Sequence, residues 1–338
     1  MAHYKGVDYY GIDDLLTEEE RMVRNTVREF VEEKFLPGVG KHYRDGTFPM
    51  EVIPQLGEMG LLGTSIHGYD CAGMNAIVYG LICQELERGD SGLRSFASVQ
   101  SSLVMYPIDA FGTEAQKQKY LPQLAAGKMI GCFGLTEPDY GSNPSGMITR
   151  ARKKGDKYVL NGAKMWITNG SIADVAVVWA KDDEGDIRGF LVDKDTPGFR
   201  AVDIEGKFSL RASATSELIL EVCEIPAENM FPNIKGLKGP LSCLNQARYG
   251  ISWGALGAAM ACYDTALNYA QNRIQFDRPI AGFQLVQQKL VTMVTEITKG
   301  QLLALRLGQL KDNGKMNPAQ ISMAKMNNVR VALEISRV

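Results

Sequence analysis

Apolar residues near the start of the chain recur at the spacing of one helix face. Thr17 and Glu20 precede this stripe and form a capping box, in which two side chains satisfy free N–H groups of a first helical turn. Pro37 follows the stripe, and we expect the helix to end there because proline cannot donate the helical hydrogen bond. The stripe consists of Met22, Val23, Val27, Phe30, Val31 and Phe35.

Two further helices are predicted before residue 130. Apolar side chains at helical spacing favour a helix over residues 77–87. Thr113 and Gln116 form a second capping box, and the helix that begins there is expected to run towards Gly127.

From Gly131 onward the pattern changes to short β-rich segments with no long helix between them. The segment 154–156 predicts a turn, and Asn161-Gly162 is a strong hairpin signal because both residues tolerate a positive φ. Consecutive strands without helical crossovers favour an antiparallel sheet or a small barrel. The predicted strands cover residues 158–160, 164–168, 175–180, 189–192 and 218–222.

Helices return after Pro232, over residues 241–273 and 283–312, and Pro318 is placed to open a last one. The predicted fold class is therefore α+β and multidomain, with N-terminal helices, a middle β domain and a C-terminal helical bundle. We expect these domains to cover residues 1–130, 131–232 and 233–338. Because no helix-stop residue follows the last apolar positions, we expect the chain to be truncated and the last bundle to be incomplete.

The composition of the chain limits the kinds of partner that the protein is expected to bind. The 338 residues carry 37 basic and 39 acidic side chains, a net charge of −2, so neither nucleic acid nor an anionic membrane is expected as a partner. No segment approaches the roughly 20 apolar residues that cross a bilayer, so no membrane insertion is expected. Six cysteines without CxxC spacing and three histidines near the N-terminus predict reduced thiols and no metal site. A cytoplasmic location is preferred, and the mitochondrial matrix is the alternative for a eukaryotic protein.

Three segments could hold a flavin. Gly141 and Ser142 offer N–H groups and a hydroxyl for a pyrophosphate, and Thr136 could bond the edge of a heteroaromatic ring. Trp166 and Thr168 point to the same face of a predicted strand, where they would supply an aromatic wall and a hydroxyl. An ordinary loop and a core tryptophan remain the alternatives.

The third segment, 273–280, leads to Gln284 and could bind phosphate and adenine, or could be a solvated loop. The match of 250–254 to a G-x-S-x-G nucleophile elbow is rejected, because it lies in a helical stretch with no histidine after it. Its glycines, with Gly257, are expected to let another helix or a ligand approach closely. No Rossmann or P-loop motif is present.

The three motifs FGLTEPDYGS (133–142), KMWITN (164–169) and RIQFDRPI (273–280) occur in order and register, and with them the chain resembles the acyl-CoA dehydrogenase family. The resemblance covers about residues 16–338. It implies a homotetramer in which FAD is bound by one subunit and reached by Arg273 and Gln284 of a neighbour. The implied FAD-binding residues are Phe133, Leu135, Thr136, Gly141, Ser142, Trp166, Ile167, Thr168, Arg273, Gln275, Phe276 and Gln284.

Further segments, including 85–95, 207–213 and 243–250, resemble the glutaryl-CoA dehydrogenase branch of the family. A distal carboxylate on the substrate needs a buried cation, and the guanidinium of Arg94 is suited to it because its fork makes two charge-assisted bonds. The alternative is a structural salt bridge between Arg94 and Glu87 or Asp90. The implied substrate-binding residues are Glu87, Arg94, Ser95, Ser98, Ser142, Asn245, Arg248 and Tyr249.

The resemblance implies α,β-dehydrogenation of an acyl-CoA, with electrons passed to an electron-transfer flavoprotein. In the glutaryl branch, loss of CO2 then gives crotonyl-CoA. We assign no catalytic base, because the family's usual carboxylate is expected beyond Val338 and Ala247 stands where a minority of relatives place it. A short-chain dehydrogenase of other specificity, or a non-catalytic fragment that binds FAD and acyl-CoA, remain alternatives.

Overall fold

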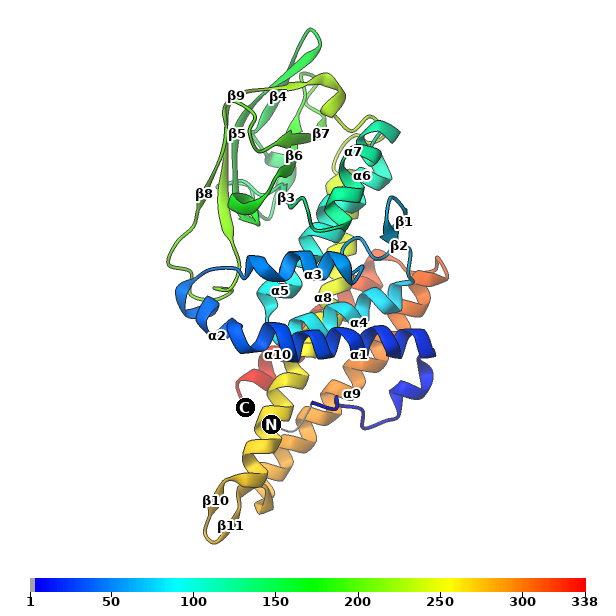
Figure 1. Ribbon diagram of the computed structural model, residues 1–338, viewed down its shortest axis with the longest axis vertical. Helices are drawn as coiled ribbons and strands as arrows, with labels where there is room; N and C mark the ends of the chain where they lie inside the picture. Colours follow the sequence, from blue (N-terminus) through cyan, green and yellow to red (C-terminus); the bar gives the residue numbers. More distant parts are fainter. Residues whose placement is uncertain (1–3) are drawn as a thin grey trace. The chain divides into compact units, whose positions relative to one another are not determined.

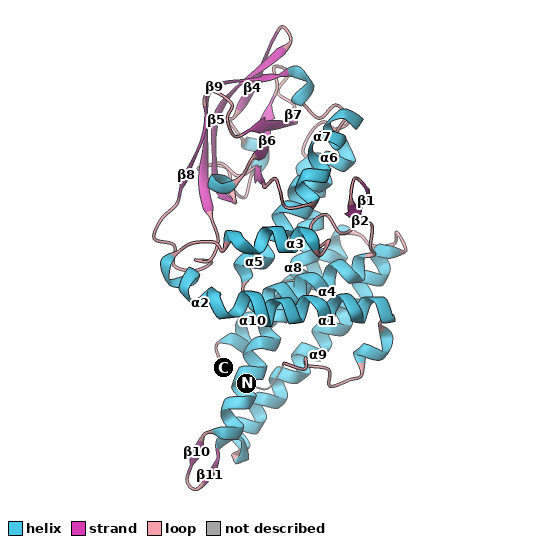
Figure 2. Ribbon diagram, viewed as in Figure 1, coloured by secondary structure: helices cyan, strands magenta, loops and turns pink. Residues whose placement is uncertain are grey.

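The computed structural model describes residues 4–338, and the chain divides into two compact units. The first unit combines Met1–Pro37, Asn75–Arg94 and Arg248–Val338, and the second combines Gly38–Met74 and Ser95–Ala247. Along the chain the order is helices, then strands, then helices, as predicted (Figure 2). The three predicted domain boundaries stay a prediction. Among residues 4–338 no helix is both long and apolar enough to cross a membrane.

The first unit is a helical bundle around Tyr249, Trp253, Leu256 and Ile297, which are all buried. Both predicted capping boxes are present in the structure, the one at Thr17 within this unit. A short hairpin of β10 (Ile274–Gln275) and β11 (Arg278–Pro279) lies at one end of the bundle (Figure 1). The helices are α1 (Glu18–Phe30), α4 (Ala76–Gly89), the later part of α8 (Lys238–Asn272), α9 (Gln284–Asp312) and α10 (Pro318–Ser336).

The prediction that Pro37 ends the first helix is wrong. The helical chain continues from α1 through a π-helical segment, Val31–Phe35, into α2 (Leu36–Asp45). In this widened turn the Leu36 N–H donates to Val31 O, five residues back. Pro37 is then the second residue of α2, where proline is tolerated because its missing N–H is not needed.

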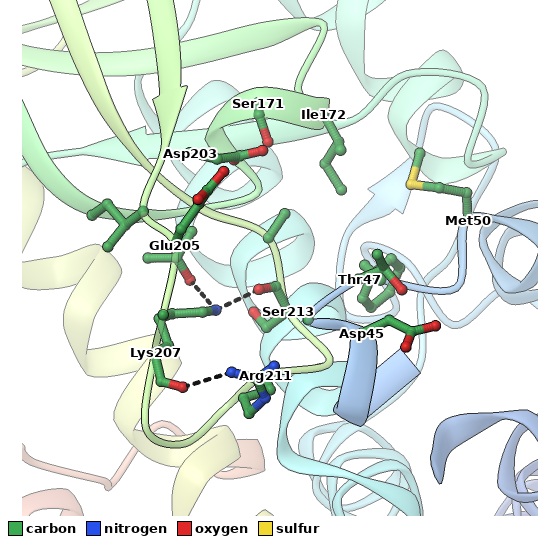
Figure 3. A pocket seen from close by; sticks show the side chains of 16 residues that line it. Asp45, Thr47, Met50, Ser171, Ile172, Asp203, Glu205, Lys207, Arg211 and Ser213 are labelled. Carbon is green, nitrogen blue, oxygen red and sulfur yellow. Dashed lines mark hydrogen bonds between the residues drawn. The ribbon is translucent and has the colours of Figure 1, made fainter. Parts of the chain in front are cut away.

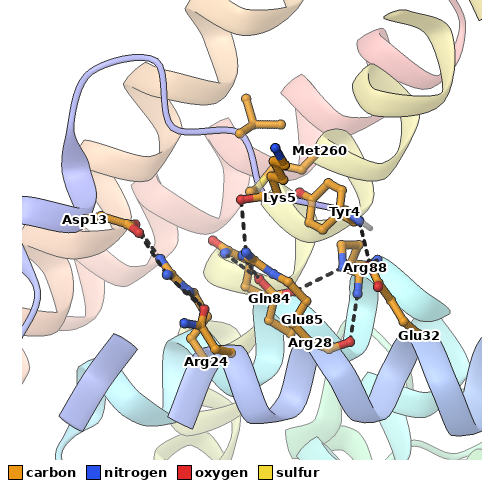
Figure 4. Close-up of polar contacts among 12 residues, drawn as sticks. Tyr4, Lys5, Asp13, Arg24, Arg28, Glu32, Gln84, Glu85, Arg88 and Met260 are labelled. Atoms are coloured by element: carbon orange, nitrogen blue, oxygen red, sulfur yellow. Dashed lines mark hydrogen bonds and ion pairs between the residues drawn. The ribbon is translucent and has the colours of Figure 1, made fainter. Parts of the chain in front are cut away.

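A buried polar cluster joins α4 to α1 (Figure 4). Glu85 is fully buried and accepts hydrogen bonds from Arg28 at 2.8 and 3.2 Å and from Arg88 at 3.0 Å. The Tyr4 ring lies under both guanidinium groups, 5.1 Å from that of Arg28 and 4.3 Å from that of Arg88. The Tyr4 N–H donates to Glu32 at 3.2 Å, which ties the N-terminal segment to α1. These bonds fix the orientation of α4, which carries Glu87 on another side.

The second unit is built on a seven-stranded sheet with the order β3-β6-β4-β5-β9-β8, and β7 pairs with β6. Most pairs are antiparallel as expected, but β3 runs parallel to β6, which the long connection between them permits. Short helices accompany the sheet: α3 (Ile53–Glu58), α5 (Ser91–Ser98), which begins in the first unit, α6 (Tyr106–Phe111) and α7 (Glu114–Ala125). A two-stranded sheet pairs β1 (His67–Gly68) with β2 (Cys71–Ala72). The strands are β3 (Gly131–Gly134), β4 (Arg150–Lys154), β5 (Lys157–Thr168), β6 (Val175–Lys181), β7 (Ile187–Asp193), β8 (Phe199–Asp203) and β9 (Thr215–Pro226).

The predicted hairpin at Asn161-Gly162 is wrong, whereas the turn predicted at 154–156 joins β4 to β5. β5 is one continuous strand that pairs with β9 along its length, with a bulge between Leu160 and Gly162. Gly162 has a φ of +148°, and the Asn161 side chain accepts from the Val222 N–H at 2.8 Å. Pairing on both sides of β5 thus turns the local signal for a reversal into a bulge.

We predict that Gly162→Ala lowers the free energy of unfolding by about 2–3 kcal/mol, because strained backbone and overpacking add. A Cβ atom at this position would lie 2.7 Å from Thr149 Cβ. Gly155→Ala is the matched control: φ is +64° there but nothing lies within 4 Å, so only about 1 kcal/mol is expected. Urea unfolding of both variants measures the difference, and equal losses would show that the contact with Thr149 is unimportant.

Candidate functional site

A cavity of about 390 Å³ in the second unit gathers the predicted flavin residues. Phe133 and Leu135 come from β3 and the loop behind it, and Trp166 to Thr168 come from the end of β5. Eight residues predicted to bind FAD line this one cavity: Phe133, Leu135, Thr136, Gly141, Ser142, Trp166, Ile167 and Thr168. The remaining lining residues are Val99, Leu103, Pro144, Leu241 and Leu244.

A second β-bulge turns Trp166 into this cavity. The register of β5 with β9 shifts between Lys164 and Ile167, and Trp166 has a φ of +62°. Such a backbone is unusual for a bulky residue and is characteristic of strained functional positions. The indole is 62% exposed although it lies in a strand of the sheet. The bulge is tied to the loop after β3, because the Met165 N–H donates to Thr136 O at 2.8 Å.

A buried ion pair connects the two halves of the cavity wall. The Lys164 ammonium lies 2.8 Å from a Glu137 oxygen and also donates to Leu135 O at 3.1 Å. The Glu137 carboxylate accepts N–H groups of Ile148 at 2.7 Å and Thr149 at 3.0 Å. Both side chains are essentially inaccessible, at 0 and 1% exposure. The pair therefore holds the loop of the first flavin motif against the strand of the second.

Both members of this pair are charged at neutral pH. Burial raises the pKa of the Glu137 carboxyl, but the hydrogen bond and charge of Lys164, with the donors of Thr149 and Ile148, outweigh it and lower the pKa below its usual value. Burial lowers the pKa of the Lys164 ammonium to about 8, against the opposing effect of Glu137. A carboxylate held this way is a poor proton acceptor, so Glu137 is a structural group.

The predicted substrate arginine lies in the first unit. Arg94 Nε binds one Glu87 oxygen, and Arg94 Nη2 donates to the other at 3.4 Å. Ser91 Oγ donates to Glu87 at 2.9 Å. The side chains of Arg94 and Glu87 are only 11 and 9% exposed. Burial lowers the pKa of Arg94, but the charge and hydrogen bond of Glu87 outweigh it and raise the pKa.

Five of the other six predicted substrate residues lie on two helices, and the sixth, Ser142, lines the 390 Å³ cavity. Ser95 and Ser98 follow Arg94 on α5, and Ser98, four residues from Arg94, shares its helix face. On α8, Arg248 donates to Ser322 Oγ at 2.8 Å. Tyr249 is fully buried and its hydroxyl donates to Ala76 O at 2.7 Å, which makes it a core residue of the first unit. Asn245 lies one turn earlier on α8, within the second unit, and substrate contact stays a prediction for all of them.

Four predicted FAD residues lie outside the cavity. Arg273, Gln275, Phe276 and Gln284 are exposed residues around the β10–β11 hairpin of the first unit, and Phe276 is 87% exposed. The family resemblance assigns Arg273 and Gln284 to the FAD of a neighbouring subunit, and this role stays a prediction.

A second cavity in the same unit, about 530 Å³, contains none of the predicted FAD or substrate residues (Figure 3). Lys207 turns inward and donates to Leu210 O and Thr215 Oγ1, both at 2.8 Å. Arg211 donates to Tyr43 O at 2.9 Å and to Arg44 O at 2.7 Å, at the end of α2. The two cations of this cavity, Lys207 and Arg211, both hold the surrounding loop in place through these hydrogen bonds. We therefore interpret the cavity as a result of how this loop folds.

Comparison with known proteins identifies the class. The N-terminal, middle and C-terminal domains of the acyl-CoA dehydrogenases match residues 17–128, 132–223 and 235–337. The chain belongs to the acyl-CoA dehydrogenase family, and the predicted order of helical, β and helical domains is confirmed. It is an oxidoreductase of the FAD-dependent kind that dehydrogenates acyl-CoA thioesters.

Three relatives give the likeness in detail. A glutaryl-CoA dehydrogenase from Mycobacterium smegmatis in complex with FADH2 is 53% identical with a TM-score of 0.96, covering 98% of this chain and 86% of that one. An electron transferring flavoprotein of Acidaminococcus fermentans is 38% identical with a TM-score of 0.91, covering 95% of this chain and 86% of that one. The mitochondrial short-chain specific acyl-CoA dehydrogenase of Rattus norvegicus is 37% identical, over 95% of this chain and 79% of its own length.

The pairing of Glu137 with Lys164 escaped the sequence analysis. Its only signal was an acidic residue in the first flavin motif and a basic one in the second, both among apolar neighbours. The apolar wall of Val99, Leu103 and Leu244 gave no signal, because such residues line cores and cavities alike.

We predict that Lys164→Met lowers the free energy of unfolding by about 3–5 kcal/mol, since it leaves a buried carboxylate unpaired. FAD affinity falls with it, because the loop loses one of its ties to the strand and keeps the hydrogen bond between the Met165 N–H and Thr136 O. Pairing the change with Glu137→Gln restores most of the stability.

Lys157→Met is the matched control on the same strand. Lys157 pairs with Glu224 at 3.2 Å on the surface, and its loss costs at most about 1 kcal/mol. Urea unfolding and FAD titration measure both effects. A Lys164→Met protein with unchanged FAD affinity would contradict the role given to the pair.

Proposed function

We propose that this chain is a glutaryl-CoA dehydrogenase that oxidises glutaryl-CoA with FAD and then releases CO2 to give crotonyl-CoA. The observation that carries the proposal is the buried guanidinium of Arg94. Its Nε and Nη2 atoms are engaged by Glu87, so the outer edge of the fork is left to receive a second carboxylate. The likeness to the Mycobacterium smegmatis glutaryl-CoA dehydrogenase supports the same substrate.

The residues of the 390 Å³ cavity fit the flavin that the family uses. When bound, FAD accepts the hydride from the substrate's β-carbon. Trp166 would lie against the ring face, and the Thr168 and Thr136 hydroxyls would bond its polar edge. Gly141 and Ser142 would hold the pyrophosphate through N–H groups and a hydroxyl.

Two carboxylates near the predicted site are excluded as the base that removes the α-proton. Glu137 is neutralised by Lys164 and Glu87 by Arg94, each within a buried pair. We therefore assign Glu87 to orienting Arg94 and leave the base unassigned. A solved structure of the electron transferring flavoprotein of Acidaminococcus fermentans holds a chain like this one, which supports such a flavoprotein as the electron acceptor. A homotetramer and a cytoplasmic location stay predictions.

The runner-up function is dehydrogenation of a short monocarboxylic acyl-CoA. The observation in its favour is the 37% identity to the rat short-chain enzyme. In that case the Arg94–Glu87 pair would be only a structural salt bridge.

We predict that FAD quenches the fluorescence of Trp166 when it is titrated into the cofactor-free protein. Trp179 and Trp253 are buried, at 0 and 3% exposure, so the exposed indole dominates the change. In Trp166→Phe most of the quenching disappears, while FAD affinity falls by no more than about tenfold, because a ring contact contributes on the order of 1 kcal/mol. Undiminished quenching in this variant would place the flavin elsewhere.

We predict that Arg94→Met lowers kcat/KM for glutaryl-CoA by about 100-fold, because a buried charge pair with the substrate is lost. The value for butyryl-CoA should stay within about tenfold, a difference of 1.4 kcal/mol in barrier height. Combining Arg94→Met with Glu87→Gln avoids an unpaired carboxylate and keeps the protein folded.

Arg88→Met is the matched control, because Arg88 is a buried arginine of α4 that pairs with Glu85. It should lower stability without changing the ratio between the two substrates. Equal losses for glutaryl-CoA and butyryl-CoA in Arg94→Met would favour the short-chain function instead.

A further inference from the structure

Gly254 lies in the middle of α8, where glycine is less favourable than alanine. A Cβ atom built on it would overlap Glu87 Oε2, and it would lie 3.1 Å from Glu87 Cδ and 3.3 Å from Arg94 Nε. The Glu87 carboxylate therefore occupies the space that a methyl group at position 254 would fill. We infer that Gly254 is a specificity-determining residue. Because it leaves this space to the Glu87 carboxylate, it sets the orientation of the Arg94 guanidinium. The inference rests on the proposed function, since it assumes that Arg94 binds the distal carboxylate.

The carboxylate has little freedom to move aside. Glu87 Oε1 is held by Ser91 Oγ at 2.9 Å and by Arg94 Nη2 at 3.4 Å, and its other oxygen is bound by Arg94 Nε. The Glu87 side chain is only 9% exposed, so little solvent-filled space lies next to it. A methyl group at position 254 must therefore displace the carboxylate, and the guanidinium that is bound to it follows.

The two helices are also held close on both sides of Gly254. One turn earlier, a Cβ on Gly250 would lie 3.1 Å from Cys83 Sγ and 3.2 Å from the Tyr79 hydroxyl. One turn later, a Cβ on Gly257 would overlap the backbone oxygen of Gln84. Because α4 is fixed at both neighbouring contacts, it cannot retreat to make room at position 254. The strain falls on the side chains of the Glu87–Arg94 pair.

The effect of this strain is selective. A glutaryl chain ends in a carboxylate that needs the Arg94 fork in one orientation, because a bidentate pair depends on geometry. A butyryl chain ends in a methyl group and makes no such bond. Displacing the guanidinium therefore weakens binding of the first substrate and leaves the second nearly unaffected.

The test is Gly254→Ala in the FAD-loaded enzyme, assayed with glutaryl-CoA and butyryl-CoA. We expect KM for glutaryl-CoA to rise by about 30-fold, the loss expected for one charge-assisted hydrogen bond. KM for butyryl-CoA should change by less than about twofold, the usual limit for independent sites. A merely structural role would move both values together and would overturn the inference.

Glu87→Asp supplies the decisive comparison, because its carboxylate is one methylene shorter and leaves room for the added methyl group. In the Glu87→Asp background, Gly254→Ala should change KM for glutaryl-CoA by less than about twofold. An equal penalty in both backgrounds would overturn the inference. The same background serves if Gly254→Ala alone fails to fold: a double variant that folds supports the overlap, and one that does not contradicts it.

Gly250→Ala is the matched control, a glycine of the same helix that faces α4 at Cys83 and Tyr79 and not at Glu87. It should leave the ratio between the two substrates unchanged, and an equal shift of that ratio would refute the special role of Gly254. Failure of this inference is distinguishable from failure of the proposed function. If Arg94→Met abolishes the preference for glutaryl-CoA but Gly254→Ala does not, only the role of Gly254 is refuted.

Discussion

The ion pair of Glu137 and Lys164 is the interaction on which the flavin cavity depends. Two charges are removed from water, and three further hydrogen bonds offset part of that cost: the Ile148 and Thr149 N–H groups donate to Glu137, and Lys164 donates to Leu135 O. The pair joins a loop to a strand that is distant in sequence, and the loop carries the small residues and hydroxyls of the cavity. A second tie between the same loop and strand is the hydrogen bond from the Met165 N–H to Thr136 O. The cavity thus takes its shape from these polar ties together with its apolar lining.

Much of the fold could be predicted because its strongest signals are local. The capping box at Thr17 and the proline at 318 start helices where expected. The errors occur where distant partners override a local preference. Pro37 is accommodated by the widened turn before it, and Asn161-Gly162 is drawn into a long strand by β9. Neither the extra residue of a π-turn nor the length of a partner strand can be predicted from the residues next to it in the sequence.

The candidate site was predicted where its chemistry is distinctive and missed where it is not. Trp166 and Thr168 were expected on one face of a strand, and both line the cavity, although a bulge rather than simple alternation brings them there. The expectation that Gly254 and its neighbours admit another helix is confirmed by the approach of α4. Leu241 could not have been identified, because its position depends on a contact between distant segments. The partner of a buried charge is likewise settled only in three dimensions.

The left-handed backbone at Trp166 has a consequence for how a ring ligand is received. The bulge, held to the loop after β3 through Thr136, sets the position from which the indole projects into the cavity. The main chain beneath the indole is held by this hydrogen bond and by strand pairing at Lys164 and Ile167, which lowers the conformational entropy that stacking of a ring on this wall would cost.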